Sequence, residues 1–235
     1  MPTYTLELSI DANDLEVIKS AGENIIVAKP VNSAIATPNI AWLSIIPLEG
    51  NQITWTENYA MYASTTQVQG GASIFQTSAT PYPAEDGICY ELDPAGVFSG
   101  ATTGPEPVSA GSYSSLNNYT ALPAMTLGLT QSATTTSGNF TLNPLNAQSV
   151  PSLQQVIFTP FTTVWVWLQS QINSGVVLTS VFSKVAVVTF GGNVTTQSLV
   201  YDAKHGQFEP PSSSAANVRF LDFTRYGVSR TRRLR

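Results

Sequence analysis

Apolar and polar residues alternate with a period of two along most of the chain, which is typical of half-buried β-strands. Near the start, Tyr4, Leu6, Leu8 and Ile10 alternate with polar residues. From residue 24 onward, clusters of Gly, Pro, Asn and Asp separate further short runs of this kind. The pattern predicts strands over 24–29, 40–46, 51–57, 59–64, 66–77, 87–91, 125–131, 138–142, 153–159, 162–169, 176–182, 184–190 and 195–201.

One short helix is predicted near the N-terminus, over residues 14–21. Asn13 is placed to cap it, Glu16 follows three residues later as in a capping box, and Gly22 ends it. Many short strands and a single helix predict an all-β fold. We expect a two-sheet antiparallel sandwich, of the jelly-roll or Greek-key type, with this short N-terminal helix packed against it.

The length of 235 residues fits one large β domain, and the sequence contains no evident internal repeat. A stretch rich in Gly, Ser, Pro and Thr, 100–124, is predicted to be a long loop or, alternatively, a boundary between two halves. We favour a single domain over residues 1–209. A Pro/Ser linker and an Arg-rich flexible tail are expected over 210–235.

Charged residues make up only 11% of the chain, compared with about 25% in ordinary globular domains. Residues 1–217 carry a net charge of −10, whereas residues 218–235 carry +5. The body should therefore repel nucleic acid and anionic membranes, and the tail should attract them. The N-terminus has no signal-peptide pattern. We expect a cytoplasmic protein, or one released without a classical signal peptide.

The inventory of reactive side chains argues against most enzyme classes. His205 is the only histidine and Cys89 the only cysteine, so no disulfide can form within the chain. One His and one Cys do not supply the ligands of a zinc site, and His205 lies in a predicted exposed turn. We therefore expect no enzymatic activity, no metal centre and no cofactor, although chemistry by paired carboxylates is harder to dismiss.

Two groups of carboxylates have alternative interpretations. The cluster Glu85, Asp86, Glu91 and Asp93 is either a solvated acidic loop, which we favour, or a calcium-binding loop. Glu57 has the parity of an apolar strand face, which would bury it if the strand were continuous. We favour a turn at Glu57-Asn58 that exposes the glutamate, because burial of an unpaired carboxylate is unfavourable.

Aromatic residues offer the most specific candidate site. Trp165 and Trp167 share one face of the predicted strand 162–169, and their two indoles, about 7 Å apart, would form a flat apolar strip. Tyr59 and Tyr62 provide a second candidate rim. The alternative is that the strand is central and both of its faces are buried, since the neighbouring residues 175–190 are apolar on both parities.

The C-terminal tail contains six arginines interleaved with aromatic residues, a combination that suits phosphate pairing and base stacking. We consider it either an arm for an anionic partner or an appended disordered segment. The arginines are Arg219, Arg225, Arg230, Arg232, Arg233 and Arg235.

These features favour a non-enzymatic, lectin-like protein that binds neutral glycans by aromatic stacking and by hydroxyl and amide hydrogen bonds. One alternative is a self-assembling structural β protein of a capsid, filament or crystal, with a basic C-terminal arm. A second is a β-pore-forming toxin, because the alternating Ser/Thr-rich stretches 64–80 and 126–142 suit amphipathic hairpins. The expected partners are a neutral glycan or copies of the chain in a homo-oligomer, with nucleic acid only through the tail.

Overall fold

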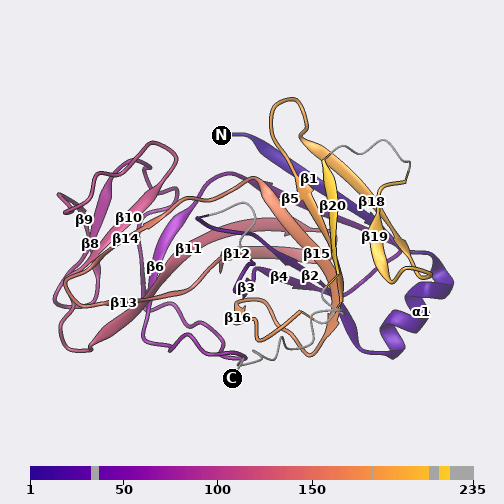
Figure 1. The fold of residues 1–235 in the computed structure, drawn as a ribbon, viewed down its shortest axis with the longest axis horizontal. Helices are drawn as coiled ribbons and strands as arrows, with labels where there is room; N and C mark the ends of the chain where they lie inside the picture. Colours follow the sequence, from indigo (N-terminus) through magenta and orange to yellow (C-terminus); the bar gives the residue numbers. More distant parts are fainter. Residues whose placement is uncertain (33–36, 182, 212–216, 223–235) are drawn as a thin grey trace, which may run out of the picture.

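The computed structural model describes residues 1–32, 37–181, 183–211 and 217–222, which form β-sheets and one short helix (Figure 1). The predicted all-β fold class, with antiparallel sheets and an N-terminal helix, is confirmed. The largest sheet has nine strands in the order β19-β18-β1-β5-β11-β6-β7, with β12 and β13 also paired to β11. Its strands are β1 (Thr3–Ser9), β5 (Gly50–Thr56), β6 (Ala60–Ser64), β7 (Ser78–Ala79), β11 (Ala124–Thr135), β12 (Gly138–Pro144), β13 (Gln148–Pro151), β18 (Thr196–Asp202) and β19 (Gln207–Glu209).

Three smaller sheets complete the β structure of the described residues. A five-stranded sheet has the order β20-β17-β15-β2-β4, with β2 (Glu23–Ala28), β4 (Leu43–Ile45), β15 (Thr163–Ser170), β17 (Lys184–Thr189) and β20 (Val218–Asp222). A four-stranded sheet contains β8 (Cys89–Leu92), β9 (Phe98–Thr102), β10 (Tyr113–Asn117) and β14 (Gln155–Phe158). The last pairs β3 (Ile40–Ala41) with β16 (Val176–Val177). In Figure 1 the four-stranded sheet lies at one end of the molecule and the helix at the other.

The main core is an apolar cluster to which the nine-, five- and four-stranded sheets all contribute. Leu6 and Leu8 of β1, Ile25 and Val27 of β2, and Val166 of β15 are all buried in it. Each of these strands contributes alternate residues, as the period of two predicted. On β1 the pattern is regular, because Thr5 and Glu7 face outward between buried leucines.

The helix α1 (Ala12–Ser20) starts two residues earlier than predicted. Its N-cap is Asp11 rather than Asn13, and the Asp11 carboxylate accepts a hydrogen bond from the Asn13 backbone N–H at 2.9 Å. At the other end the prediction is correct: Gly22 follows the C-cap with a φ of 66°, a conformation that glycine adopts readily. Leu15 and Ile18 bury the inner face of the helix.

Several predicted elements differ from the structure. Residues 66–77 contain no strand, because Gly70-Gly71 form a turn and the backbone of this segment bonds instead to residues 175–177. The predicted strand 176–182 is reduced to β16. The predicted loop 100–124 contains β10 in its second half. Two strand pairs, β1 with β18 and β8 with β10, are parallel rather than antiparallel.

The predicted end of the folded body at residue 209 is also wrong. β20 continues the five-stranded sheet by pairing antiparallel with β17, with Ala186 opposite Phe220. Within the residues that the structure describes, no helix is long and apolar enough to cross a bilayer.

Gly128 provides a test of how closely this fold is packed. A Cβ atom there would lie 2.1 Å from the Asn146 carbonyl oxygen and 2.7 Å from Cε1 of Tyr62. The Tyr62 hydroxyl donates to that same carbonyl oxygen at 2.6 Å, so the glycine makes room for this bond. We expect Gly128→Ala to lower the free energy of unfolding by at least about 1–3 kcal/mol, measured by urea denaturation.

The matched control is Gly50→Ala, because a Cβ at Gly50 meets no heavy atom within 4 Å. Its unfolding free energy should change by no more than about 0.5 kcal/mol. Equal stability of the two variants would contradict the packing around Gly128.

Candidate functional site

The tryptophans predicted to form a ligand strip are buried, so that prediction is wrong. Trp165 and Trp167 lie on β15, and each is only 1% exposed. They point to the side of the five-stranded sheet away from the main core, where Ile172, Leu178 and Val181 pack with them in a second apolar cluster. The alternative interpretation, a central strand with two buried faces, is the correct one.

The second candidate rim is also buried. Tyr59 is 2% exposed and Tyr62 is fully buried, and both hydroxyls donate hydrogen bonds inside the protein, to Glu57 and to the Asn146 carbonyl. Burial raises the pKa of both phenols, and for Tyr59 the nearby Glu57 carboxylate adds to the effect. Neither ring is available to a ligand at the surface.

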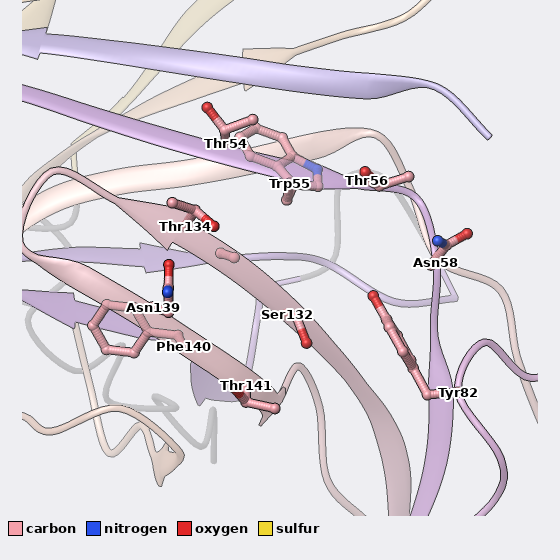
Figure 2. A pocket seen from close by; sticks show the side chains of 11 residues that line it. Thr54, Trp55, Thr56, Asn58, Tyr82, Ser132, Thr134, Asn139, Phe140 and Thr141 are labelled. Atoms are coloured by element: carbon pink, nitrogen blue, oxygen red, sulfur yellow. The ribbon is translucent and has the colours of Figure 1, made fainter.

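The structure instead reveals a groove on the outer face of the nine-stranded sheet, with a volume of about 400 Å³ (Figure 2). Its floor and walls come from the end of β5, from the β11–β12 hairpin and from the loop that carries Tyr82. The polar residues that line it are all uncharged hydroxyl or amide side chains: Thr54, Thr56, Asn58, Ser132, Thr134, Asn139 and Thr141. Figure 2 shows Thr54 and Thr56 on one strand, with Ser132 and Thr134 on the neighbouring one.

The alternation of β-strands explains this composition. Trp55 and Ala133 point inward to the main core, so Thr54, Thr56, Ser132 and Thr134 must point outward. The register places Thr134 directly opposite Thr54 and also opposite Asn139. Three adjacent strands therefore present one row of a hydroxyl, a hydroxyl and an amide.

Two aromatic side chains border the polar surface of the groove. Tyr82 is 41% exposed, and Figure 2 shows its ring extending from the neighbouring loop toward the polar residues. Phe140 of β12 is half-buried, because one part of it packs against the main core. No charged side chain lines the groove among the described residues.

Several polar side chains of the groove have no hydrogen-bond partner among the described residues. The side chains of Asn58, Tyr82, Thr134, Asn139 and Thr141 make no hydrogen bond to any residue that the structure describes. By contrast, Thr54 and Thr56 bond to the hydroxyls of Thr5 and Thr3, at 3.3 and 3.0 Å. The groove thus combines two hydroxyls that are hydrogen-bonded to β1 with polar side chains that have no such bond to the described residues.

Directly beneath the groove lies a buried ion pair. Lys29, which follows β2, is 1% exposed, and its Nζ lies 2.9 Å from Oε1 of Glu57. The ammonium also donates to Gln131 Oε1 at 3.0 Å and to the Tyr59 hydroxyl at 3.3 Å. All three of its protons are therefore used.

Aromatic rings surround the ammonium of Lys29 on several sides. Its Nζ lies 5.5 Å from the ring centres of Trp42 and Trp55 and 5.3 Å from that of Tyr59, within the range of cation–π attraction. The indole N–H of Trp55 donates to Glu57 Oε1 at 2.6 Å. The prediction that Glu57 is exposed is thus wrong: the chain does turn there, but Lys29 supplies the partner that burial requires.

Burial lowers the pKa of Lys29, because it removes water from the ammonium, while the neighbouring Glu57 acts in the opposite direction. Over the pH range between this lowered value and the ordinary one, the unfolded chain binds more protons than the folded protein. The contribution of Lys29 to stability therefore grows with rising pH in that range.

The only histidine of the sequence lies in an acidic turn. His205 is exposed in the turn between β18 and β19, as predicted, with Nδ1 2.7 Å from Asp202 and 3.1 Å from Glu209. These three are the only described residues of their kinds whose ligand atoms gather closely enough to hold a metal ion, and the sequence analysis did not identify them. Desolvation opposes ionisation of Asp202, but the hydrogen bonds from the His205 side chain and from the Lys204 and His205 backbone, with the charge of His205, together outweigh it and lower the pKa of Asp202.

The acidic residues near Cys89 do not converge on a calcium site. Glu85 is exposed, whereas the other three carboxylates accept hydrogen bonds from different parts of the chain. Asp86 accepts from the Gly111 N–H, Glu91 from the Asn118 side chain, and Asp93 from the N–H groups of residues 95 and 97.

Of the predicted anionic-partner arginines, only Arg219 falls within the described residues, where it is an exposed residue of β20 opposite Val187. The other five lie outside the described residues: Arg225, Arg230, Arg232, Arg233 and Arg235.

The buried ion pair leads to a stability prediction. Glu57→Gln keeps the shape of the side chain but leaves the Lys29 ammonium without its counter-charge. We expect a loss of about 3–5 kcal/mol in the free energy of unfolding, measured by urea denaturation. Glu49→Gln, at an exposed position, should leave stability almost unchanged. A Glu57→Gln protein as stable as the control would show that the ion pair does not contribute to the free energy of unfolding.

The buried phenol of Tyr113 should make stability depend on pH in the alkaline range. Burial raises the pKa of Tyr113 to about 12, and the charges of Asp86 and Glu57 add to the effect. Between about pH 10 and 12 the unfolded phenol has lost its proton while the folded one keeps it, so stability should fall with rising pH in that range. Tyr113→Phe should make this fall less steep in denaturant titrations made at increasing pH. An unchanged slope would contradict the raised pKa.

No protein-family model matches this chain, and neither does any curated protein sequence or solved structure, so the candidate groove rests on its own geometry.

Proposed function

We propose that the protein is a non-enzymatic binding protein that holds neutral glycans in the groove between β5, the β11–β12 hairpin and Tyr82. The observation that carries the proposal is the set of uncharged hydroxyl and amide side chains, several of them without a partner in the described part of the chain, beside an exposed aromatic ring. The ligand class is the one expected from composition, but the residues are different ones.

Sugar rings present two kinds of surface, and the groove offers a complement to each. Their C–H faces pack on aromatic rings, a role for which Tyr82 and the accessible part of Phe140 are placed. Their hydroxyls both donate and accept hydrogen bonds, as do the side chains of Thr134, Asn139 and Asn58. A volume of about 400 Å³ falls in the range of small-molecule sites and suits a short saccharide.

The absence of charge in the lining distinguishes between ligand classes. An anionic ligand would gain no counter-ion among the described residues of the groove, and it would approach a body whose residues 1–217 carry a net charge of −10. A cationic ligand would find no carboxylate there. A neutral polyhydroxylated ligand needs neither a positive nor a negative partner in the groove.

The other functions considered have less support in the described residues. The assembly hypothesis relies chiefly on a basic arm, most of which lies outside them. The pore-forming hypothesis requires 126–142 to leave the fold, but β11 pairs with β5, β6, β12 and β13, and its Leu127 and Leu129 are fully buried. The groove requires no such rearrangement.

The proposal is tested by screening the full chain against an array of neutral oligosaccharides and measuring the best binder by calorimetry. Tyr82→Ala should weaken that binder about fivefold, equivalent to about 1 kcal/mol, because it removes the stacking surface. Phe75→Ala removes an aromatic side chain that is 76% exposed but does not line the groove, and it should bind like the parent protein.

Two results would refute the proposal: a flat array across all neutral glycans, or a binder whose affinity is the same for Tyr82→Ala and the parent protein. The first would dismiss the ligand class, and the second would place binding elsewhere on the molecule.

A further inference from the structure

Three groups that can form an amide bond meet in the interior of the protein. An amine (Lys29), a carboxamide (Gln131) and a carboxyl group (Glu57) are 1%, 0% and 8% exposed. Lys29 Nζ lies 2.9 Å from Glu57 Oε1 and 3.0 Å from Gln131 Oε1. The carbonyl carbon of Gln131 is one C=O bond, about 1.23 Å, from that oxygen. The nucleophile, the electrophile and a proton carrier are therefore in contact.

We propose that Lys29 and Gln131 become joined by an isopeptide bond inside the folded protein, with Glu57 transferring the proton. The inference is independent of the glycan groove, since it concerns the inner face of the same strands. The bond would link the chain just after β2, in the five-stranded sheet, to β11 in the nine-stranded sheet.

The reaction balances without any oxidant, reductant or added reagent. Glu57 takes a proton from the Lys29 ammonium, and the resulting amine attacks the carbonyl carbon Cδ of Gln131. The Nζ–Cδ bond forms and the Cδ–Nε2 bond breaks. Glu57 returns the proton to Nε2, which leaves as ammonia, and then takes up the second proton of Nζ, so that Glu57 ends as a neutral carboxylic acid beside the new secondary amide. The net change is the conversion of a primary amine and a primary amide into a secondary amide and one molecule of ammonia.

The surroundings hold the reacting groups in place. The indole N–H of Trp55 and the Tyr59 hydroxyl both donate to Glu57, so the carboxyl group is fixed beside Nζ. Gln131 Nε2, the leaving group, donates to the Thr56 carbonyl oxygen at 2.8 Å, on the residue next to Glu57. Groups fixed in this way react as parts of one molecule, which removes much of the entropic barrier.

Burial favours the product over the starting ion pair. A charged ammonium and carboxylate are poorly solvated in the interior, whereas the amide carries no net charge. The lowered pKa of Lys29 agrees with this, since it increases the fraction of nucleophilic amine. A surface cavity of about 290 Å³ is lined in part by Lys29, and it offers the released ammonia a path to solvent.

Lys29 is distinctive among the lysines. In the described part of the chain it is the only lysine whose Nζ bonds to a side-chain amide: Lys184 donates to the His205 backbone carbonyl, and Lys19 and Lys204 are exposed. One specific cross-link is therefore expected, rather than a mixture.

The decisive experiment is the intact mass of the purified full chain after denaturation. We expect a mass lower than that of the sequence by one ammonia. Digestion after glutamate, which leaves the Glu106-Pro107 and Glu209-Pro210 bonds intact, should then yield fragments 24–49 and 92–235, which contain Lys29 and Gln131, as one joined species. An intact mass that matches the sequence would overturn the proposal. So would an ammonia loss with the two fragments separate, which would indicate reaction at another amide.

Variants separate the roles of the three residues. Lys29→Met and Gln131→Leu should each retain the full mass expected from their sequences, because one reacting group is missing. Glu57→Gln should retain most of its ammonia although both reacting groups remain. Gln148→Ala, at an exposed position on β13, should lose ammonia like the parent protein. A Lys29→Met protein that still loses ammonia would contradict the proposal, and this readout applies even to protein recovered unfolded.

Discussion

The burial of the Lys29 ammonium is the constraint on which the centre of this molecule depends. A cation with 1% exposure is tolerated only where every proton finds an acceptor and a counter-charge is close. Glu57, Tyr59 and Gln131 meet that requirement, and they come from the turn after β5, the residue just before β6 and the middle of β11. The ammonium therefore fixes three parts of the large sheet relative to the end of β2, in the opposing sheet. Hydrogen bonds of the ammonium depend on direction more strongly than apolar contacts do. The rings of Trp42, Trp55 and Tyr59 lie around the ammonium at cation–π distance.

The same strands carry the buried cluster on one face and the groove on the other. Trp55, Glu57 and Gln131 point inward, while Thr54, Thr56, Asn58 and Ser132 line the outer surface. Because successive side chains of a strand point to opposite sides, whatever fixes the inner residues also fixes the outer ones. The Gln131 side chain even bonds to the backbone of Thr56, a groove residue, at 2.8 Å. The groove is thus built on a rigid base, which limits the entropy that a ligand must remove on binding.

Much of the strand pattern could be predicted from the sequence, whereas the candidate site could not. Alternation reveals which residues of a strand share a face, but it does not reveal what covers that face. Trp165 and Trp167 do share a face, yet that face is covered by Ile172, Leu178 and Val181. These three residues lie outside the strands, so strand alternation does not reveal their position. In the same way, the parity of Glu57 indicated an inward direction, but its partner Lys29 is 28 residues distant at the end of an apolar strand. The residues near Glu57 in the sequence include no compensating positive charge, so burial of its carboxylate could not be predicted from them. The groove is even harder to predict from the sequence. It brings together residues near 54, 82 and 134, and the strand register that places 54 beside 134 is known only from the folded structure.

The low proportion of charged residues is related to the way the large sheet pairs its polar side chains. A chain with few charges must stabilise polar groups through hydrogen bonds among neutral partners, and the large sheet does so with hydroxyl pairs such as Thr3 with Thr56 and Thr5 with Thr54. On the outer face of the β11–β12 hairpin, Thr134 and Asn139 stand opposite each other without such a bond in the described structure. Next to Tyr82, therefore, the outer face of the sheet presents polar side chains that do not bond to each other, whereas the hydroxyls of β1 and β5 are paired. A neutral ligand with hydroxyl groups would continue the hydrogen-bonding pattern that the protein uses for its own surface, and this continuity is the physical reason for proposing glycans as the ligands of the groove.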